Sequence, residues 1–190
     1  LREAARRISR VAAGLPELAR AGRRERDVAA EIDAAMRTEG FERPAFETIV
    51  ASGPNSALPH ARPGTRELRT GEGVVLDFGG VYDGYCVDLT RTISLGPMRE
   101  DFRRMFDAVR EAQAAALAAV TPGVAAAAID AEARRVLSDR GFGDAVGHGT
   151  GHGLGLEVHE EPRISRQTPP EERIEAGMVF TVEPGAYVPG

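Results

Sequence analysis

The sequence predicts an α+β fold made of two similar halves, in which helices cover one face of a curved antiparallel sheet. Ala- and Arg-rich helical stretches alternate with short β-rich stretches along 190 residues, a length that suits one domain. The two helical pairs also align without gaps at an offset of 101 residues, which places Gly22 on Gly123 and residues 40–41 on residues 141–142. Shared Ala-rich composition is the alternative explanation of this likeness.

The first half of the chain contains two predicted helices, one strand and one hairpin. Helix-forming residues dominate the first forty positions, apolar residues recur there at helical spacing, and Gly40 ends the second helix. Residues 46–51 predict a strand, followed by a loop rich in Gly, Pro, Asn and Ser. Residues 74–80 and 85–94 predict two strands, and the intervening Asp-Gly pair is typical of a tight antiparallel hairpin.

The second half repeats the helical pair and then becomes irregular. Helices are expected over about residues 99–120 and 124–140, with Gly141 as the stop. A Gly/His-rich loop, a short segment around residues 157–160 and a polar Pro-rich loop follow. We expect a last strand over residues 178–184, because the stretch MVFTVEP is largely apolar and β-branched.

Composition and charge narrow the class of protein. Hydrophobic residues make up 42% of the chain and charged residues 28%, which is typical of a folded globular protein. The formal net charge of −5 disfavours nucleic acid as a partner, because phosphate binding needs a surplus of Lys and Arg. No apolar run approaches the roughly 20 residues of a membrane span, so no membrane partner is expected. A single cysteine, Cys86, suits a reducing, cytoplasmic location.

The histidines are the first indication of chemistry. All four lie outside the predicted helices, at His60, His148, His152 and His159. Three of them fall within residues 147–162, together with five glycines that would let the backbone approach a ligand. A lone histidine is more often structural than functional, but three in such a stretch favour a functional site.

Three carboxylates supply the rest of the expected site. Asp77 and Asp88 lie on either side of the Asp-Gly turn, so antiparallel pairing would bring them to one face. Two carboxylates so placed repel each other, and either one takes up a proton or a multivalent cation neutralises both. Glu183 ends another apolar strand. With one histidine and no thiolate, this oxygen-rich set suits Mn, Fe, Co or Zn in a two-metal site.

Three stretches of the chain carry a family resemblance. Residues 77–92, 149–162 and 180–185 resemble the metal-site motifs of the pita-bread dinuclear metallopeptidases, which include methionine aminopeptidases, Xaa-Pro aminopeptidases and prolidases. The resemblance implies the pita-bread fold, and it implies that Asp77 chelates one metal while Asp88 bridges both. It also implies that His152 binds the second metal and that Glu183 is a ligand able to carry a proton.

The same resemblance implies roles for the other three histidines. His159 would steady the tetrahedral intermediate, and His60 would contact substrate near the scissile amide. His148 would border the substrate pocket, with a loop-stabilising role as its alternative. Thr90 is expected to support a ligand. His148 and the stretch over residues 84–92 resemble the proline-directed branch rather than the methionine aminopeptidases.

The resemblance therefore implies a metal-dependent peptidase that hydrolyses Xaa-Pro amide bonds with a hydroxide bridging two divalent metal ions, manganese ahead of cobalt, iron or zinc. The expected partner is a peptide with proline at its second position, and a homodimer stays open. The alternatives are a methionine aminopeptidase-like enzyme, a metal-free hydrolase of the creatinase type, or a non-catalytic pita-bread module that binds peptides or proteins. The retained ligand set argues against the last two.

One feature of the family pattern has no counterpart in the chain. The pattern requires a second glutamate that bridges the metals, on a strand after Glu183, and no residue up to Gly190 fills that role. Glu171, Glu172 and Glu175 lie in a polar loop and are expected to be solvated. We expect residues 1–190 to be a single catalytic domain, truncated at its C-terminus, without the family's N-terminal domain and weakly active by itself.

Overall fold

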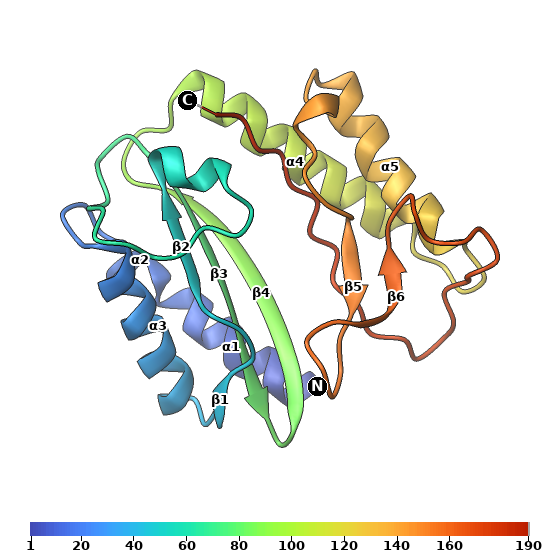
Figure 1. The fold of residues 1–190 in the computed structure, drawn as a ribbon, viewed down its shortest axis with the longest axis horizontal. Coiled ribbons are helices and arrows are strands. Elements are labelled where there is room, and N and C mark those ends of the chain that lie inside the picture. Colours follow the sequence, from blue (N-terminus) through green and yellow to red (C-terminus); the bar gives the residue numbers. More distant parts are fainter. Residues whose placement is uncertain (190) are drawn as a thin grey trace. The chain divides into compact units, whose positions relative to one another are not determined.

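A computed structural model describes residues 1–189, which divide into two units of similar construction (Figure 1). The first unit comprises Leu1–Arg99 together with the segment Gly155–Val158, whose Gly155 carbonyl accepts a hydrogen bond from the Cys86 N–H at 2.7 Å. The second unit comprises Glu100–Leu154 and His159–Val188. Among the described residues, no helix is both long and apolar enough to cross a lipid bilayer.

The first unit is an antiparallel sheet whose central strand is β3, with helices packed on one face. Its helices are α1 (Arg2–Ala13), α2 (Leu15–Leu18) and α3 (Glu25–Thr38). Its strands are β1 (Arg43–Pro44), β2 (Ile49–Ser52), β3 (Gly73–Tyr82) and β4 (Tyr85–Ser94), and η1 (Gly53–Ala57) follows β2. β4 pairs with one edge of β3, while β1 and β2 share the other edge.

The core of the first unit follows from the period of two along its strands. Val74, Leu76 and Phe78 of β3 are fully buried against helices α1 and α3, as one face of an amphipathic strand should be. The intervening residues of β3, including Asp77, therefore lie on the opposite face. Val74, Leu76 and Phe78 therefore face the helices, and Asp77 faces away from them.

The β3–β4 hairpin confirms the prediction made from its turn. Tyr82 pairs with Tyr85 across a two-residue turn, in which Asp83 has a φ of 51° and Gly84 a φ of 74°. A type I′ turn needs left-handed conformations at both positions, and Asp and Gly tolerate them. The long, curved hairpin that results is visible in Figure 1.

The strand expected over residues 46–51 is displaced toward the C-terminus, since β2 spans Ile49–Ser52. Between β1 and β2 the chain leaves the edge of β3, and the ring of Phe46 packs against Gly79 instead. A Cβ added at Gly79 would lie within 2.5 Å of Cε1 of Phe46. Glycine at this position therefore makes room for the aromatic ring.

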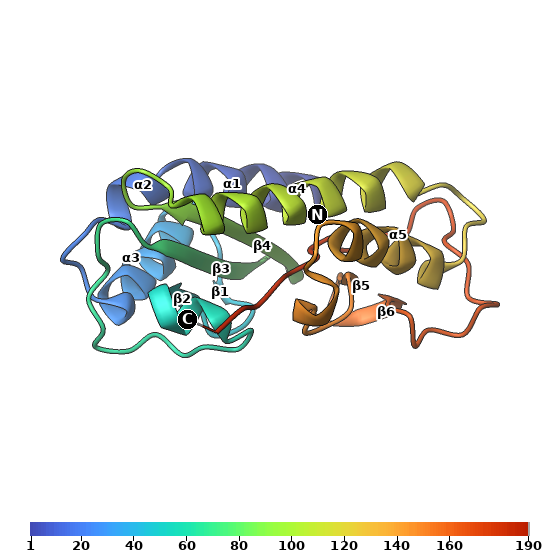
Figure 2. The same cartoon turned by 90° about the horizontal axis from the view of Figure 1, so that it is seen from above.

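The second unit contains helices α4 (Glu100–Ala119) and α5 (Ala126–Asp139), η2 (Gly143–Ala145), and a small sheet of β5 (Gly151–Gly153) and β6 (Glu160–Ile164). The two helices lie side by side (Figure 1, Figure 2). Fully buried small residues at Ala108, Ala112 and Ala116 form a stripe at helical spacing along α4. They pack in one cluster with Ile129, Ala133 and Leu137 of α5.

The predicted internal repeat is present in the structure. Helices α3 and α5 have the same length, and their first residues, Glu25 and Ala126, differ by the 101 positions of the sequence offset. The glycines that bracket the helices match as well, with positive φ at all four positions: Gly22, Gly123, Gly40 and Gly141. Similar composition alone would not reproduce matching helix ends and matching left-handed glycines.

β6 begins at Glu160, at the end of the short segment singled out over residues 157–160. One expectation for the second half is wrong. The last strand expected over residues 178–184 is not regular, and within it only Phe180 forms a bridge, to Gly153 of β5. The reason is that the N–H of His152 donates to the hydroxyl of Thr181 rather than to a backbone carbonyl, so the ladder is incomplete.

A partly buried ion pair gives the first unit a predictable response to acid. Arg66 donates two hydrogen bonds to the Glu72 carboxylate, at 2.8 and 2.5 Å. The hydrogen bond from Arg66, which outweighs the opposing effect of burial, lowers the pKa of Glu72. Such a carboxylate stabilises the fold above its ordinary pKa and loses this contribution as the pH falls through its lowered pKa.

Glu72→Gln is therefore expected to lower the free energy of unfolding by up to about 1 kcal/mol near neutral pH. The difference in Tm between wild type and variant should close as the pH falls below the ordinary carboxyl range, because acid removes the same charge from the wild type. Thermal unfolding followed by circular dichroism from pH 7 to pH 3 measures this. Glu67→Gln, at an exposed position nearby, is the control. A gap that stays constant with pH would contradict the assignment.

Candidate metal centre

Two aspartates lie on the face of the β3–β4 hairpin that is turned away from the helices. The register pairs Asp77 with Thr90 and Gly79 with Asp88. Residues opposite each other across an antiparallel ladder share a face, as do residues two positions apart on one strand. Asp77 and Asp88 therefore lie on the same face of the hairpin, as predicted from the sequence.

Thr90 and Gly79 are neighbours of the Asp77 and Asp88 carboxylates on this face. The hydroxyl of Thr90 donates to Oδ1 of Asp77 at 2.9 Å, which agrees with the supporting role expected for Thr90. Gly79 stands two positions from Asp77 and directly opposite Asp88. Both aspartates are partly buried. Two carboxylates on one partly buried face favour a cation between them.

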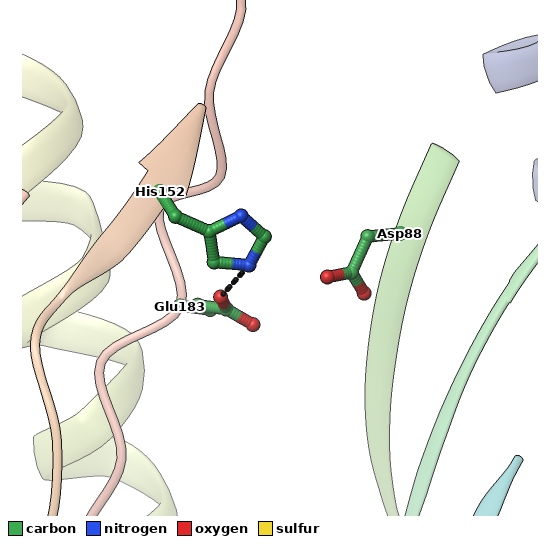
Figure 3. A group of neighbouring side chains, drawn as sticks. All are labelled: Asp88, His152 and Glu183. Atoms are coloured by element: carbon green, nitrogen blue, oxygen red, sulfur yellow. Dashed lines mark ion pairs between the residues drawn. The ribbon is translucent and has the colours of Figure 1, made fainter. Parts of the chain in front are cut away.

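The second unit brings His152 and Glu183 into contact. His152 lies on β5, and Glu183 lies on the extended segment alongside it (Figure 3). Nε2 of His152 is 3.2 Å from Oε1 of Glu183, and the two side chains are 13% and 28% exposed. Nδ1 of His152 lies 3.0 Å from the carbonyl of Gly153. A metal ion would take Nε2 in place of its proton, while a proton on Nδ1 continues to satisfy the Gly153 carbonyl.

Thr181 connects the two residues. Its hydroxyl accepts the backbone N–H of His152 at 3.0 Å and donates to Oε1 of Glu183 at 2.8 Å. Burial raises the pKa of Glu183, but hydrogen bonds from His152 and Thr181, together with the charges of His152 and His148, lower it further than burial raises it. The net effect holds the pKa of Glu183 below its usual value.

The glycines on either side of His152 allow other backbone segments to pack closely against β5. A Cβ added at Gly151 would overlap the carbonyl of Thr181, and one added at Gly153 would overlap the carbonyl of Glu161. The sequence predicted that these glycines let the backbone approach a ligand, but these two let β5 approach its neighbours on both sides. Because Gly151 and Gly153 lack side chains, β5 packs close to Thr181, and this packing sets the position of His152 relative to Thr181.

The other three histidines, at positions 159, 148 and 60, differ in their surroundings. His159 is exposed in the second unit, and its ring centroid lies 4.4 Å from that of His152 in an edge-to-face arrangement. Nε2 of His148 lies 2.8 Å from the hydroxyl of Tyr187, and its Nδ1 lies 2.6 Å from the carbonyl of Gly149. His60 is exposed on the loop after η1 in the first unit. Tyr187 is a neighbour of His148 that the sequence did not reveal.

The chemical types of the candidate ligands suit a divalent metal ion. Asp88, His152 and Glu183 each offer one ligand atom and are each partly buried (Figure 3). Asp77 is the fourth candidate ligand. It lies on β3, which pairs with β4, the strand that carries Asp88. Carboxylate oxygens with one imidazole and no thiolate are the set preferred by Mn²⁺, Fe²⁺, Co²⁺ and Zn²⁺.

Comparison with known proteins identifies the class. The whole chain, residues 1–190, matches metallopeptidase family M24, and the chain belongs to this family. The Xaa-Pro dipeptidase of Pyrococcus furiosus is 45% identical over 168 residues, which cover 88% of this chain and 48% of the relative. The chain thus spans about half the length of the curated relatives it matches. The predicted family resemblance is confirmed.

Solved structures agree with this placement. The prolidase from Pyrococcus furiosus matches 98% of this chain and 55% of its own, with a TM-score of 0.95 and 42% identity. The Xaa-Pro dipeptidase from Bacillus anthracis matches 100% of this chain and 53% of its own, with a TM-score of 0.97 and 38% identity. These matches confirm the predicted pita-bread fold.

Proposed function

We propose that the protein is a peptidase that hydrolyses Xaa-Pro amide bonds with the help of two divalent metal ions. The observation that carries this proposal is the placement of Asp77 and Asp88 on one face of the β3–β4 hairpin, in a chain that matches a metallopeptidase family along its whole length. Relatives that are 45% and 43% identical are named Xaa-Pro dipeptidase, which supports the choice of bond.

In this proposal Asp77, Asp88, His152 and Glu183 hold the metal ions, with manganese expected ahead of cobalt, iron or zinc. When bound, two divalent ions lower the pKa of a water molecule toward neutrality and polarise the scissile carbonyl. The carboxylates of the hairpin supply the negative charge that two such ions require. Thr90 and Thr181 keep Asp77 and Glu183 in fixed orientations through their hydroxyl groups.

The other polar residues act on the peptide. His159 donates an N–H to the oxygen that becomes negative as the amide carbon turns tetrahedral, a contribution that typically changes the rate by roughly 100- to 1000-fold. His60 contacts substrate near the scissile amide, and Glu183 takes up the proton released by the attacking water and passes it to the leaving nitrogen. His148, oriented by Tyr187, borders the pocket for the proline ring.

Proline is a reasonable target for such a site because an Xaa-Pro bond is a tertiary amide without an N–H. A pocket built for it need not offer an acceptor at that nitrogen, and it can close around the pyrrolidine ring instead. The substrate is then a peptide with proline at its second position. We place the enzyme in the cytoplasm, because residues 1–190 contain a single cysteine, Cys86, and so no disulfide framework of their own.

The test compares kcat/KM for an Xaa-Pro peptide and a Met-Ala peptide, using the protein as its gene encodes it and with Mn²⁺ supplied. We expect the Xaa-Pro peptide to be preferred by roughly 10- to 200-fold, the range that differences in pocket contacts provide. Chelation with EDTA should abolish the activity. A preference for Met-Ala would support the methionine aminopeptidase alternative, and binding of both peptides without cleavage would support the non-catalytic one.

A further inference from the structure

A buried carboxylate on α5 accepts hydrogen bonds from loops of the second unit. Asp130 is fully buried. Its Oδ1 accepts hydrogen bonds from the N–H and the hydroxyl of Thr150, at 3.0 and 2.7 Å. Its Oδ2 accepts from Nε of Arg134 at 2.6 Å and from the N–H of Arg166 at 2.8 Å. One side chain thus binds a residue of its own helix and two separate loop segments.

Two of these contacts lead to the loop before His152. Thr150 stands two residues before His152, and its carbonyl accepts the backbone N–H of Glu183 at 2.7 Å. Arg134, held by Asp130, donates from Nη2 to the carbonyl of His148 at 2.8 Å. The carboxylate of Asp130 therefore anchors the loop that leads into His152 and, through Thr150, the segment that carries Glu183.

The first unit has a counterpart on the related helix of the repeat. Glu25, the first residue of α3, is also fully buried. Its carboxylate accepts from the N–H and hydroxyl of Ser52, from the amide of Asn55 and from the N–H of Gly64, at 2.8 to 3.2 Å. These residues bracket the loop that carries His60. Each half of the repeat thus uses a buried acid, on α3 or on α5, to fasten a loop that bears a histidine.

A merely structural role does not account well for these acids. Removing a carboxylate from water is costly, and well-packed apolar residues often stabilise a core as much as a buried ionic network does. What a carboxylate with four donors provides is a fixed orientation for each donor. In the second unit, the groups so fixed belong to the residues next to His152 and Glu183.

We propose that Asp130 is a positioning residue for metal binding: it holds the 148–150 loop so that His152 and Glu183 present their ligand atoms in the same orientation. The inference rests on the proposed function as far as the metal is concerned, but the positioning of the loop does not depend on it. Glu25 performs the same task for the His60 loop and therefore provides a matched control.

The test compares Asp130→Asn and Glu25→Gln in the protein as its gene encodes it. Both variants remove one buried charge and leave an N–H₂ where a donor needs an acceptor. Asp130→Asn is expected to speed amide hydrogen exchange over residues 147–153 by more than roughly tenfold, and to raise the Kd for Mn²⁺ by roughly 10- to 100-fold. Glu25→Gln should speed exchange over residues 52–64 and leave the Kd for Mn²⁺ within about twofold.

The outcomes separate the inference from the proposed function. A wild type that binds no Mn²⁺ would refute the proposed function, while hydrogen exchange would still decide the role of Asp130. Equal acceleration of both loops in both variants, or an unchanged loop at residues 147–153 in Asp130→Asn, would overturn the inference. If Asp130→Asn does not fold, Thr150→Val removes only the hydroxyl bond to Asp130. It should give the same pattern with smaller changes, and exchange at the wild-type rate would overturn the inference.

Discussion

His152→Ala is expected to lose metal and peptidase activity together, with kcat/KM reduced by roughly 1000-fold or more. The imidazole of His152 is held at Nδ1 by the Gly153 carbonyl and directs Nε2 toward Glu183. Alanine removes the only nitrogen donor of the candidate ligand set and leaves the Glu183 carboxylate without its ion pair. Metal content by elemental analysis and kcat/KM on an Xaa-Pro peptide, measured on the same preparation, check this expectation.

His148→Ala is the matched control, because it removes the same ring four residues earlier on the same loop. His148 contacts the hydroxyl of Tyr187 rather than a candidate metal ligand. We expect metal content to be unchanged and KM to rise by roughly tenfold, since the loss concerns substrate positioning. Equal loss of metal in both variants would mean that the whole loop is disturbed, and full metal content in His152→Ala would contradict its assignment as a ligand.

Asp88→Asn is expected to have an effect of similar size. Asparagine keeps the shape of aspartate but is neutral and offers a single acceptor oxygen, so it cannot balance the charge of two divalent ions. We expect the metal stoichiometry to fall from about two per chain to one or fewer, and kcat/KM to fall by roughly 1000-fold. Titration calorimetry with Mn²⁺ and the peptidase assay measure the two effects.

Asp83→Asn provides the control on the same hairpin. Asp83 is exposed in the turn with a φ of 51°, a conformation that asparagine also tolerates. The change removes the same charge without altering the face that carries Asp77 and Asp88. Stoichiometry and activity should match the wild type. If Asp83→Asn and Asp88→Asn behaved alike, the effect would come from net charge and not from a metal site.

The hairpin and the helices could be predicted from the sequence because their signals are local. The Asp-Gly turn fixed the register of β3 and β4, and the period of two along VVLDFGG separated the face of Asp77 from that of Phe78. The 101-residue offset anticipated the equal lengths of α3 and α5. In each case the information lies within a few residues or within a repeat of the chain itself.

The rest of the site depends on contacts between distant residues, which no local pattern encodes. Thr181 was missed, although it lies two positions before Glu183 and therefore on the same side of an extended segment. Asp130 was missed as well, although an aspartate beside Ile129 on the buried side of an amphipathic helix is itself a signal. The irregular path of residues 178–184 follows from a side-chain hydroxyl that replaces a backbone acceptor.

The most direct test of the two-metal proposal is a crystal structure of the protein as its gene encodes it, grown with Mn²⁺ and measured with X-rays at the manganese absorption edge. The proposal predicts two anomalous peaks about 3.5 to 4 Å apart, with Asp88 in contact with both and with Asp77, His152 and Glu183 among the ligands. A single peak, or peaks that Asp77 and Asp88 do not contact, would contradict it.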